Sequence, residues 1–254
     1  MTATITVTPA PVTARGNVGA YVVLTLAAPE ISSSVQPGQF VNVAVDCGIL
    51  RRPFSVYDAD RARGLLTIAF HPIGEGTRWL ATRAPGDVLD VAGPLGSGFV
   101  PVDGRSLLVG GGYGTAALSF LARTIDGPII TVAGARTADR LFIDDTLREA
   151  SIEVDVVTDD GSAGERGIVT DAMPRLLREG VTVYACGPNA MLQAVGRVTA
   201  QAGLQSQLAV EEFMACGLGV CWTCVVPVRL NGDIKHARAC TEGPVFSGEA
   251  MAWQ

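Results

Sequence analysis

Four cysteines near the C-terminus constrain what this 254-residue chain can fold into more than any other feature. Three of them, Cys216, Cys221 and Cys224, lie within the stretch EEFMACGLGVCWTC (211–224). The fourth, Cys240, follows after fifteen further residues. The order C-x4-C-x2-C with a distant fourth cysteine is that of plant-type [2Fe–2S] sites. The segment is therefore predicted to form a loop that wraps an iron–sulfur cluster.

The residues between the cysteines fit such a loop. A chain that turns sharply and points backbone N–H groups at sulfide favours glycine, and Gly217 and Gly219 stand at these positions. Zinc is the alternative, but structural zinc sites usually pair two short Cys/His knuckles, whereas here one triple precedes a distant single cysteine. Cys47 lies outside this set and is predicted to be a small, buried hydrophobic residue.

Composition excludes two classes of partner. The net charge is −6 and no Lys/Arg cluster occurs, which argues against nucleic-acid binding. The longest uncharged runs, 106–122 and 180–196, fall short of the roughly 20 apolar residues of a membrane span. The first residues lack the basic and apolar regions of a signal peptide, so a cytoplasmic protein is predicted. Cysteines in a reducing cytosol are more often metal ligands than disulfides, which supports the metal site.

The hydrophobic rhythm divides the chain into three predicted parts. Residues 1–102 contain six short β-like runs separated by Gly and Pro turns, which predicts a small antiparallel β-barrel. Residues 103–205 alternate apolar runs with helical stretches near 115–123, 138–149, 168–178 and 189–202, which predicts a doubly wound parallel sheet. Residues 206–254 form a small cysteine-bearing module in which Asn231-Gly232 predicts a tight hairpin.

Two stretches of the first part point to a phosphate. In RRPFSVY (51–57), Arg52 and Ser55 offer a guanidinium and a hydroxyl. In HPIGEGTRWL (71–80), glycines and Thr77 precede a predicted helix, whose first turn is a natural anion site. Together they suggest a dinucleotide pyrophosphate. The alternative for Arg52 is a solvated arginine on an edge strand.

Two glycine-rich turns follow predicted strands of the second part. They are LLVGGGYGTAAL (107–118) and YACGPNAML (184–192), and the first departs from G-x-G-x-x-G because Thr115 stands at the third glycine. Turns at strand ends of one parallel sheet are where such folds bind ligands. Asp159, at a third strand end, is a candidate for ribose hydroxyls or a capping residue. No hydrolytic triad or zinc-hydrolase motif is present, so no catalytic acid, base or nucleophile is predicted.

With these motifs the chain resembles the ferredoxin reductase superfamily and, more narrowly, the electron-transfer subunits of class 1B dihydroorotate dehydrogenase. The stretches that carry the closer resemblance are RRPFS, GPLGSGF, TDDGSAGERGIVTD, EEFMACGLGVCWTC and ACTEGPVF. They extend over nearly the whole chain.

The resemblance implies three cofactors. FAD would lie on the barrel at Arg52, Pro53, Phe54, Ser55, Ala69, Phe70, His71, Gly76 and Thr77. NAD would bind transiently on the parallel sheet at Gly111, Gly112, Gly114, Asp159, Cys186, Gly187 and Pro188. A [2Fe–2S] cluster would be held by Cys216, Cys221, Cys224 and Cys240.

The resemblance also implies an oxidoreductase subunit with a partner. A catalytic subunit carrying FMN would oxidise dihydroorotate in pyrimidine biosynthesis, and electrons would pass through the cluster and FAD to NAD+. The family assembles as a heterotetramer with two copies of each subunit.

Two departures and several relatives qualify this resemblance. Phe54 replaces a frequent tyrosine, and Ala116-Ala117 occupy a site where relatives often carry proline. The γ subunits of sulfhydrogenases and sulfite reductases share the layout and are the alternative enzyme. The small subunit of a NAD(P)H–ferredoxin transhydrogenase carries aspartate where this chain has Cys216. A zinc-binding interaction protein or a flavin-free iron–sulfur scaffold is the alternative of another class. Arg136 leaves the choice between NAD and NADP open.

Overall fold

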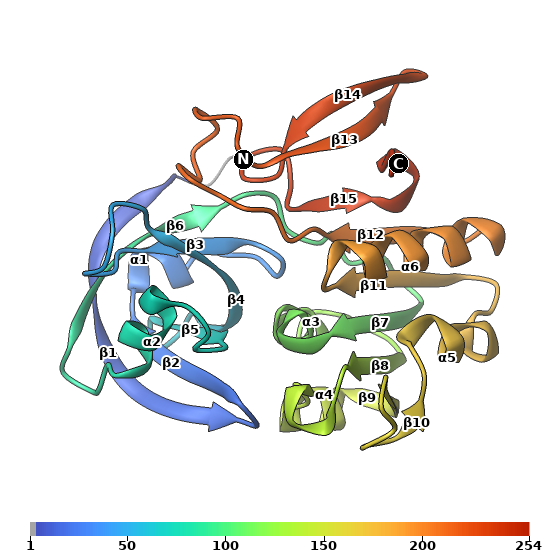
Figure 1. The fold of residues 1–254 in the computed structure, drawn as a ribbon, viewed down its shortest axis with the longest axis horizontal. Coiled ribbons are helices and arrows are strands. Elements are labelled where there is room, and N and C mark those ends of the chain that lie inside the picture. The colour runs from blue at the N-terminus through green and yellow to red at the C-terminus, as the bar shows by residue number, and fades with distance from the viewer. Residues whose placement is uncertain (1–3, 254) are drawn as a thin grey trace.

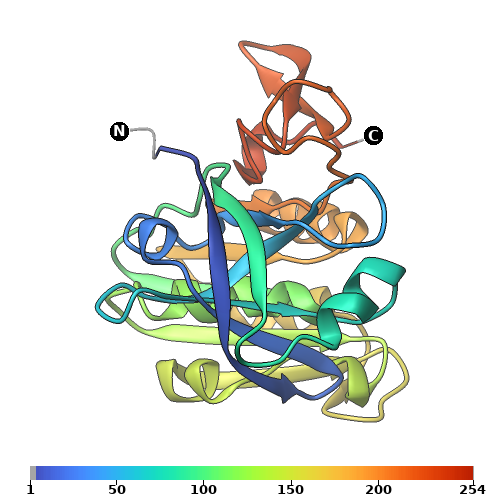
Figure 2. The same cartoon turned by 90° about the vertical axis from the view of Figure 1, so that its left-hand side faces the viewer.

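The N-terminal part is a closed antiparallel barrel in the computed structural model, which describes residues 4–253. The barrel order is β1-β2-β5-β4-β3-β6. Figures 1 and 2 show it from two directions. Its strands are β1 (Thr6–Val18), β2 (Tyr21–Ala27), β3 (Phe40–Val43), β4 (Arg52–Asp60), β5 (Leu65–Phe70) and β6 (Val88–Leu95), with short helices α1 (Pro29–Ser32) and α2 (Glu75–Ala81) between strands. The barrel predicted from the rhythm of short strands is confirmed.

The second part is a sheet of seven strands in the order β10-β9-β8-β7-β11-β12-β15. These strands are β7 (Arg105–Gly111), β8 (Ile129–Ala135), β9 (Ser151–Thr158), β10 (Glu165–Arg166), β11 (Val181–Cys186), β12 (Ser206–Ala209) and β15 (Val245–Ser247). All neighbouring pairs are parallel except β12 and β15. The helices are α3 (Thr115–Ala122), α4 (Asp145–Ala150), α5 (Val169–Leu176) and α6 (Asn189–Gln201), with single 3-10 turns η1 (Gly112–Gly114), η2 (Ala138–Arg140) and η3 (Gly248–Ala250). The predicted doubly wound sheet is confirmed.

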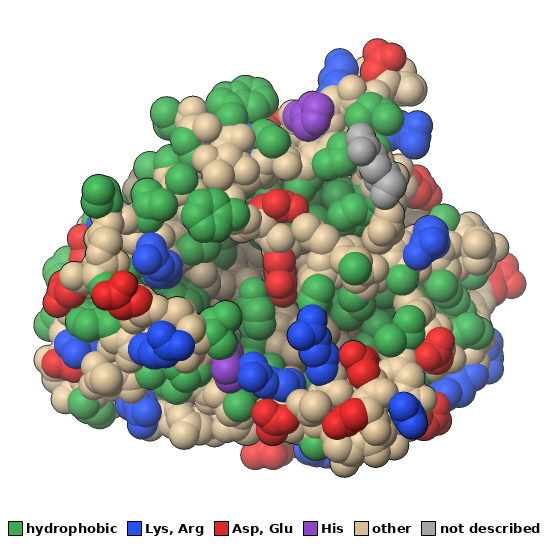
Figure 3. Space-filling model, viewed as in Figure 1, with side chains coloured by type: hydrophobic (Ala, Val, Ile, Leu, Met, Phe, Trp, Pro, Cys, Tyr) green, Lys and Arg blue, Asp and Glu red, His purple; other side chains and the backbone are tan. Residues whose placement is uncertain are grey.

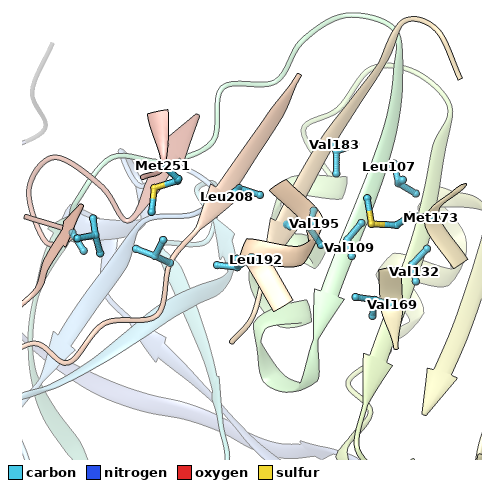
Figure 4. Packing of buried hydrophobic residues seen from close by; sticks show 14 of the residues in the cluster. Leu107, Val109, Val132, Val169, Met173, Val183, Leu192, Val195, Leu208 and Met251 are labelled. Carbon is cyan, nitrogen blue, oxygen red and sulfur yellow. The ribbon is translucent and has the colours of Figure 1, made fainter. Parts of the chain in front are cut away.

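Helices cover both faces of this sheet because its strands are apolar on both sides. On β7, Leu107 and Val109 face α5 and α6, as the close-up in Figure 4 shows. The intervening residue, Leu108, packs with α3 and α4 on the other face. The sheet is thus a rigid support that presents its strand ends toward the barrel (Figure 1).

The C-terminal part combines a hairpin with a strand of the sheet. Strands β13 (Val225–Leu230) and β14 (Asp233–Arg238) are joined by Asn231 and Gly232, whose φ angles of +53° and +88° suit the tight turn that the Asn-Gly pair predicts. After the hairpin the chain returns to the sheet, where β15 pairs antiparallel with β12.

Aromatic residues and a carboxylate join the barrel to the sheet. Phe142 is fully buried between Tyr21 and Tyr57, with ring centroids 5.5 and 5.4 Å away. The Tyr57 hydroxyl donates to Asp144, whose carboxylate also accepts the backbone N–H of Leu147 in α4. These contacts set the distance between the two parts.

No helix in residues 4–253 has the length and apolar character to cross a membrane.

Candidate functional site

A cleft of about 340 Å³ lies between the barrel and the sheet, and it appears as the central hollow in Figure 3. Eight of the residues predicted to bind cofactors line it, namely Pro53, Phe54, Ser55, Ala69, Phe70, His71, Thr77 and Cys186. The first seven come from β4, β5 and the segment around the start of α2, and Cys186 ends β11. The barrel and the sheet thus each supply one wall.

The barrel wall combines aromatic rings with polar groups. The rings of Phe54 and Phe70 lie 5.3 Å apart, and both residues are buried. Ser55 and Thr77 add hydroxyls to the same wall. An apolar surface with a few placed polar groups is what a flavin ring and its side chain require. The donor set therefore fits FAD.

Arg52 and Gly76 lie against each other beside this wall. A Cβ atom placed on Gly76 would stand 3.0 Å from the Arg52 Nε, so the Arg52 side chain packs closely against this glycine. Arg52 Nη1 also donates to the Leu50 carbonyl at 2.6 Å. The guanidinium is thereby held next to the first turn of α2, as a phosphate site requires.

The sheet wall is built where two glycine turns touch. A Cβ atom on Gly114 would be 2.7 Å from the Cys186 carbonyl oxygen, and one on Gly187 would be 3.1 Å from Gly111. Larger residues would force the ends of β7 and β11 apart. Gly112 and Pro188 belong to the same two turns, and Gly112 adopts a φ of +54°.

Asp159 lies at the end of β9 and does not line the cleft. Its backbone N–H donates to the Ala135 carbonyl, and the next residue's N–H donates to the Arg136 carbonyl. It stays a candidate for the distal part of a nucleotide, because strand ends of the same sheet edge are neighbours.

The wall residues that sequence reasoning missed come from the segment after β12 and from isolated aromatic and basic positions. They are Tyr21, Phe40, Ile73, Tyr113, Arg140, Ala209, Val210, Glu211, Glu212, Met214 and Pro244. The adjacent residues Glu211 and Glu212, between β12 and Cys216, were the available signal in the sequence. Two carboxylates so soon after a buried strand are unusual and could have marked a site.

Glu211 is the most perturbed carboxyl of the cleft. Burial raises its pKa to about 6, and a hydrogen bond with Tyr113 opposes this rise. One of its carboxylate oxygens, Oε1, is buried without a hydrogen-bond partner. A buried carboxylate oxygen without a partner is available to accept a hydrogen bond from a polar group of a ligand. The same carboxylate contributes to the raised pKa of Tyr113.

We expect Glu211→Gln to stabilise the protein at neutral pH. An acid whose pKa rises on folding from 4.5 to about 6 destabilises the folded state once ionised, so stability falls as pH rises through that window. The neutral amide avoids this cost, of about 1 to 2 kcal/mol. The thermal unfolding midpoint of the FAD-saturated variant should exceed that of the wild type at pH 7.5, and the gain should vanish near pH 4.

Glu153→Gln serves as the control, because Glu153 is exposed on β9. Its midpoint should follow that of the wild type at both pH values. A Glu211→Gln protein that melts with the wild type at pH 7.5 would show that burial of this carboxylate carries no cost.

The second site is the cysteine loop, defined as residues 216–224, together with Cys240. Cys216 Sγ accepts the backbone N–H groups of Leu218 at 3.3 Å and Val220 at 3.4 Å. Gly217 and Gly219 have φ angles of +68° and +79°, in the left-handed region that favours glycine. A Cβ atom on Gly217 would overlap the side-chain amide of Asn42 on β3, so the loop rests directly on the barrel.

The four thiols fall into two pairs. Cys216 lies close enough to Cys221 to lower the pKa of its thiol, and Cys224 lies close enough to Cys240 to raise the pKa of that thiol. A hydrogen bond from Thr223 lowers the pKa of the Cys221 thiol to about 6, whereas burial raises the pKa of Cys240 to about 11. Within residues 4–253 no three His, Cys, Asp or Glu side chains converge as ligands of a single metal ion. Two pairs suit a cluster with two irons, because each iron then takes two thiolates.

Comparisons with known proteins identify the family of this chain. Residues 211–252 match the family model described as the iron-sulfur cluster binding domain of dihydroorotate dehydrogenase B. The electron transfer subunit of dihydroorotate dehydrogenase B (NAD(+)) from Desulforamulus reducens is 37% identical over 239 residues, covering 89% of this chain and 90% of that protein. The corresponding subunit from Geobacillus kaustophilus is 39% identical, covering 90% and 91%.

Solved structures show the same layout. A structure of NADH-dependent reduced ferredoxin-NADP oxidoreductase, described for flavin-based electron bifurcation, is similar with a TM-score of 0.85 and 34% identity, covering 96% of this chain and 90% of that one. The ferredoxin reductase of carbazole 1,9a-dioxygenase shares the fold with a TM-score of 0.67 and 24% identity, covering 79% and 67%. By its relatives, its two-part cleft and its cysteine loop, this chain belongs to the family of electron transfer subunits of dihydroorotate dehydrogenase B.

Proposed function

We propose that this chain is the electron-transfer subunit of an NAD-dependent dihydroorotate dehydrogenase. The observation that carries this function is that one chain contains both a flavin-type cleft and a four-thiol loop, whose segment is attached to the sheet by β12 and β15. A flavin exchanges a hydride with nicotinamide and single electrons with iron, which is the chemistry that these cofactors supply when bound. Oxidation of dihydroorotate would release two electrons and two protons; NAD+ would take up the two electrons with one proton from solvent, so that one proton is released overall.

The chain's own residues divide this work among three segments. Residues 1–102 hold FAD through the aromatic wall and Arg52, and residues 103–205 receive the nicotinamide nucleotide at the glycine turns. Residues 206–254 hold the cluster, with β12 and β15 tying this module to the sheet. Because the cleft wall includes Cys186 from the sheet and Phe54 from the barrel, hydride donor and acceptor meet inside it.

The isolated chain should reduce a dye acceptor with NADH but not with dihydroorotate. NADH needs only the cleft, whereas dihydroorotate oxidation needs a second flavin site, and residues 4–253 build a single flavin-type cleft. The assay mixes purified, FAD-loaded chain with dye and then with either reductant. Dye reduction by dihydroorotate without another subunit would overturn the proposed function, and so would inactivity with NADH.

The partner is a catalytic dihydroorotate dehydrogenase subunit, which we propose carries FMN and assembles with this chain as two plus two copies. The cysteine loop is the proposed contact surface. It exposes the apolar side chains of Leu218, Val220 and Trp222, and Phe213 lies just before it. Exposed apolar patches of this kind mark protein interfaces. Cluster and partner flavin would then lie near each other.

Val220→Asp should weaken assembly with the catalytic subunit about tenfold or more, since a charge enters the centre of an apolar contact. The Val220 side chain is 78% exposed, so its replacement leaves the core intact. Ile234→Asp, on the far hairpin strand, is the matched control. Size-exclusion chromatography of mixed subunits, with iron content checked in both variants, measures the effect. Equal assembly of the two variants would move the interface elsewhere.

A further inference from the structure

Arg238 connects the two separate parts of the cysteine set. It is the last residue of β14 and precedes Cys240 by two positions. Its Nη1 donates to the Gly219 carbonyl at 2.9 Å, and its guanidinium carbon lies 4.9 Å from the centre of the Trp222 ring. Its Nε donates to Glu242 Oε2 at 3.0 Å. One side chain therefore contacts the cysteine loop and the segment around Cys240.

The two loop residues that Arg238 contacts have unusual backbone conformations. Gly219 has a φ of +79° and Trp222 a φ of +56°. A non-glycine residue in the left-handed region is strained, and such residues persist where their surroundings hold them. The Arg238 guanidinium donates a charged hydrogen bond to the Gly219 carbonyl and makes a cation–π contact with the Trp222 ring. These two contacts hold both loop residues in place.

Charge near the cysteines is balanced by the same residue. Glu242 lies two positions after Cys240, and its carboxylate accepts both the Arg238 Nε and the Arg238 backbone N–H, the latter at 2.8 Å. The Arg238 and Glu242 side chains are 31% and 48% exposed, so water screens the charges of this pair in part. Removing the guanidinium alone would leave the Glu242 carboxylate with the Arg238 backbone N–H but without a countercharge beside the cluster ligands.

We infer that Arg238 is a positioning residue for the iron–sulfur cluster, holding the cysteine loop against the Cys240 segment and neutralising Glu242. The inference rests on the proposed function, which assigns the cluster to the four cysteines. Loss of the guanidinium loosens the loop, so the cluster becomes more easily released. It also adds net negative charge near the cluster, which makes reduction less favourable.

Four variants separate the two effects. Arg238→Gln should release iron to a chelator roughly tenfold faster than the wild type, because the charged hydrogen bonds to the Gly219 carbonyl and to Glu242 are lost. Its cluster midpoint potential, measured by redox titration with electron paramagnetic resonance, should shift to more negative values. Arg238→Lys should keep the wild-type midpoint potential, because the positive charge is retained. It should still release iron faster than the wild type, because lysine lacks the planar guanidinium. Arg238→Gln with Glu242→Gln should restore the potential and still release iron fast. Arg229→Gln, an exposed arginine of the same hairpin, should match the wild type in both measurements.

FAD content of each variant shows whether the barrel and sheet remain folded. The inference fails if Arg238→Gln releases iron at the wild-type rate, or if the double variant keeps the negative shift. Wild-type protein that binds no iron at all would instead overturn the proposed function. The two failures are therefore distinguishable.

Discussion

Serine in place of Cys216 should abolish the native cluster while FAD binding persists. Cys216 Sγ accepts two backbone N–H groups of the loop, so the loop backbone folds around this sulfur. A serine oxygen lacks the soft donor character that iron–sulfur ligation uses. Iron and sulfide, expected at about two each per chain in the wild type, should fall to near zero. The flavin absorbance should stay, because the barrel has its own core.

Cys47→Ala is the matched control, because Cys47 packs at the margin of the barrel core rather than near the cysteine loop. Its iron and sulfide content should equal that of the wild type. Stoichiometric zinc in anaerobically purified wild-type protein would contradict the cluster, as would a full iron content in Cys216→Ser.

Alanine in place of Arg52 should weaken FAD binding by roughly ten- to a hundredfold. A hydrogen bond between a charged donor and a phosphate contributes on the order of 1.5 to 3 kcal/mol, which corresponds to that range of affinity. The structure favours this role because the Arg52 side chain fills the space left by the missing Cβ of Gly76. Fluorescence titration of FAD into flavin-depleted protein measures the change.

Arg51→Ala provides a sharp comparison, because the neighbouring arginine points to Asp90 instead. That ion pair spans 2.8 Å but is well exposed, and exposed pairs contribute little. FAD affinity should therefore be unchanged in Arg51→Ala. If Arg52→Ala retains wild-type FAD content after dialysis, Arg52 is a surface arginine that binds no phosphate.

Local patterns predicted the parts of the fold whose causes are local. Apolar runs between turn residues marked the barrel strands, and alternation of strands with helices marked the parallel sheet. The Asn231-Gly232 turn was equally readable, because few residue pairs adopt two positive φ angles in succession. The extent of β1 was not: the polar and proline residues along its thirteen positions resemble a loop, and pairing with both β2 and β6 makes it a strand.

The cleft shows where sequence patterns stop being informative. Its barrel wall came from recognisable motifs, but Tyr113, Arg140 and Glu211 reach it only because the barrel and sheet pack together. Such residues carry no periodic or spacing signal, since their neighbours in space are distant in sequence. The pairing of β15 with β12 is of the same kind, because three residues of strand are too few to mark a partner.

Strand β15 also determines how this chain can be divided and recombined. A protein cut after residue 210 would keep β12 with a bare edge, and unpaired edges template aggregation. A protein cut after residue 205 would lose β12 as well and end its sheet at β11. The four thiols are thus embedded in a segment whose two outer strands belong to the neighbouring sheet. A graft of the cysteine loop alone into another reductase would therefore lack β12 and β15, the two strands that attach this segment to the sheet.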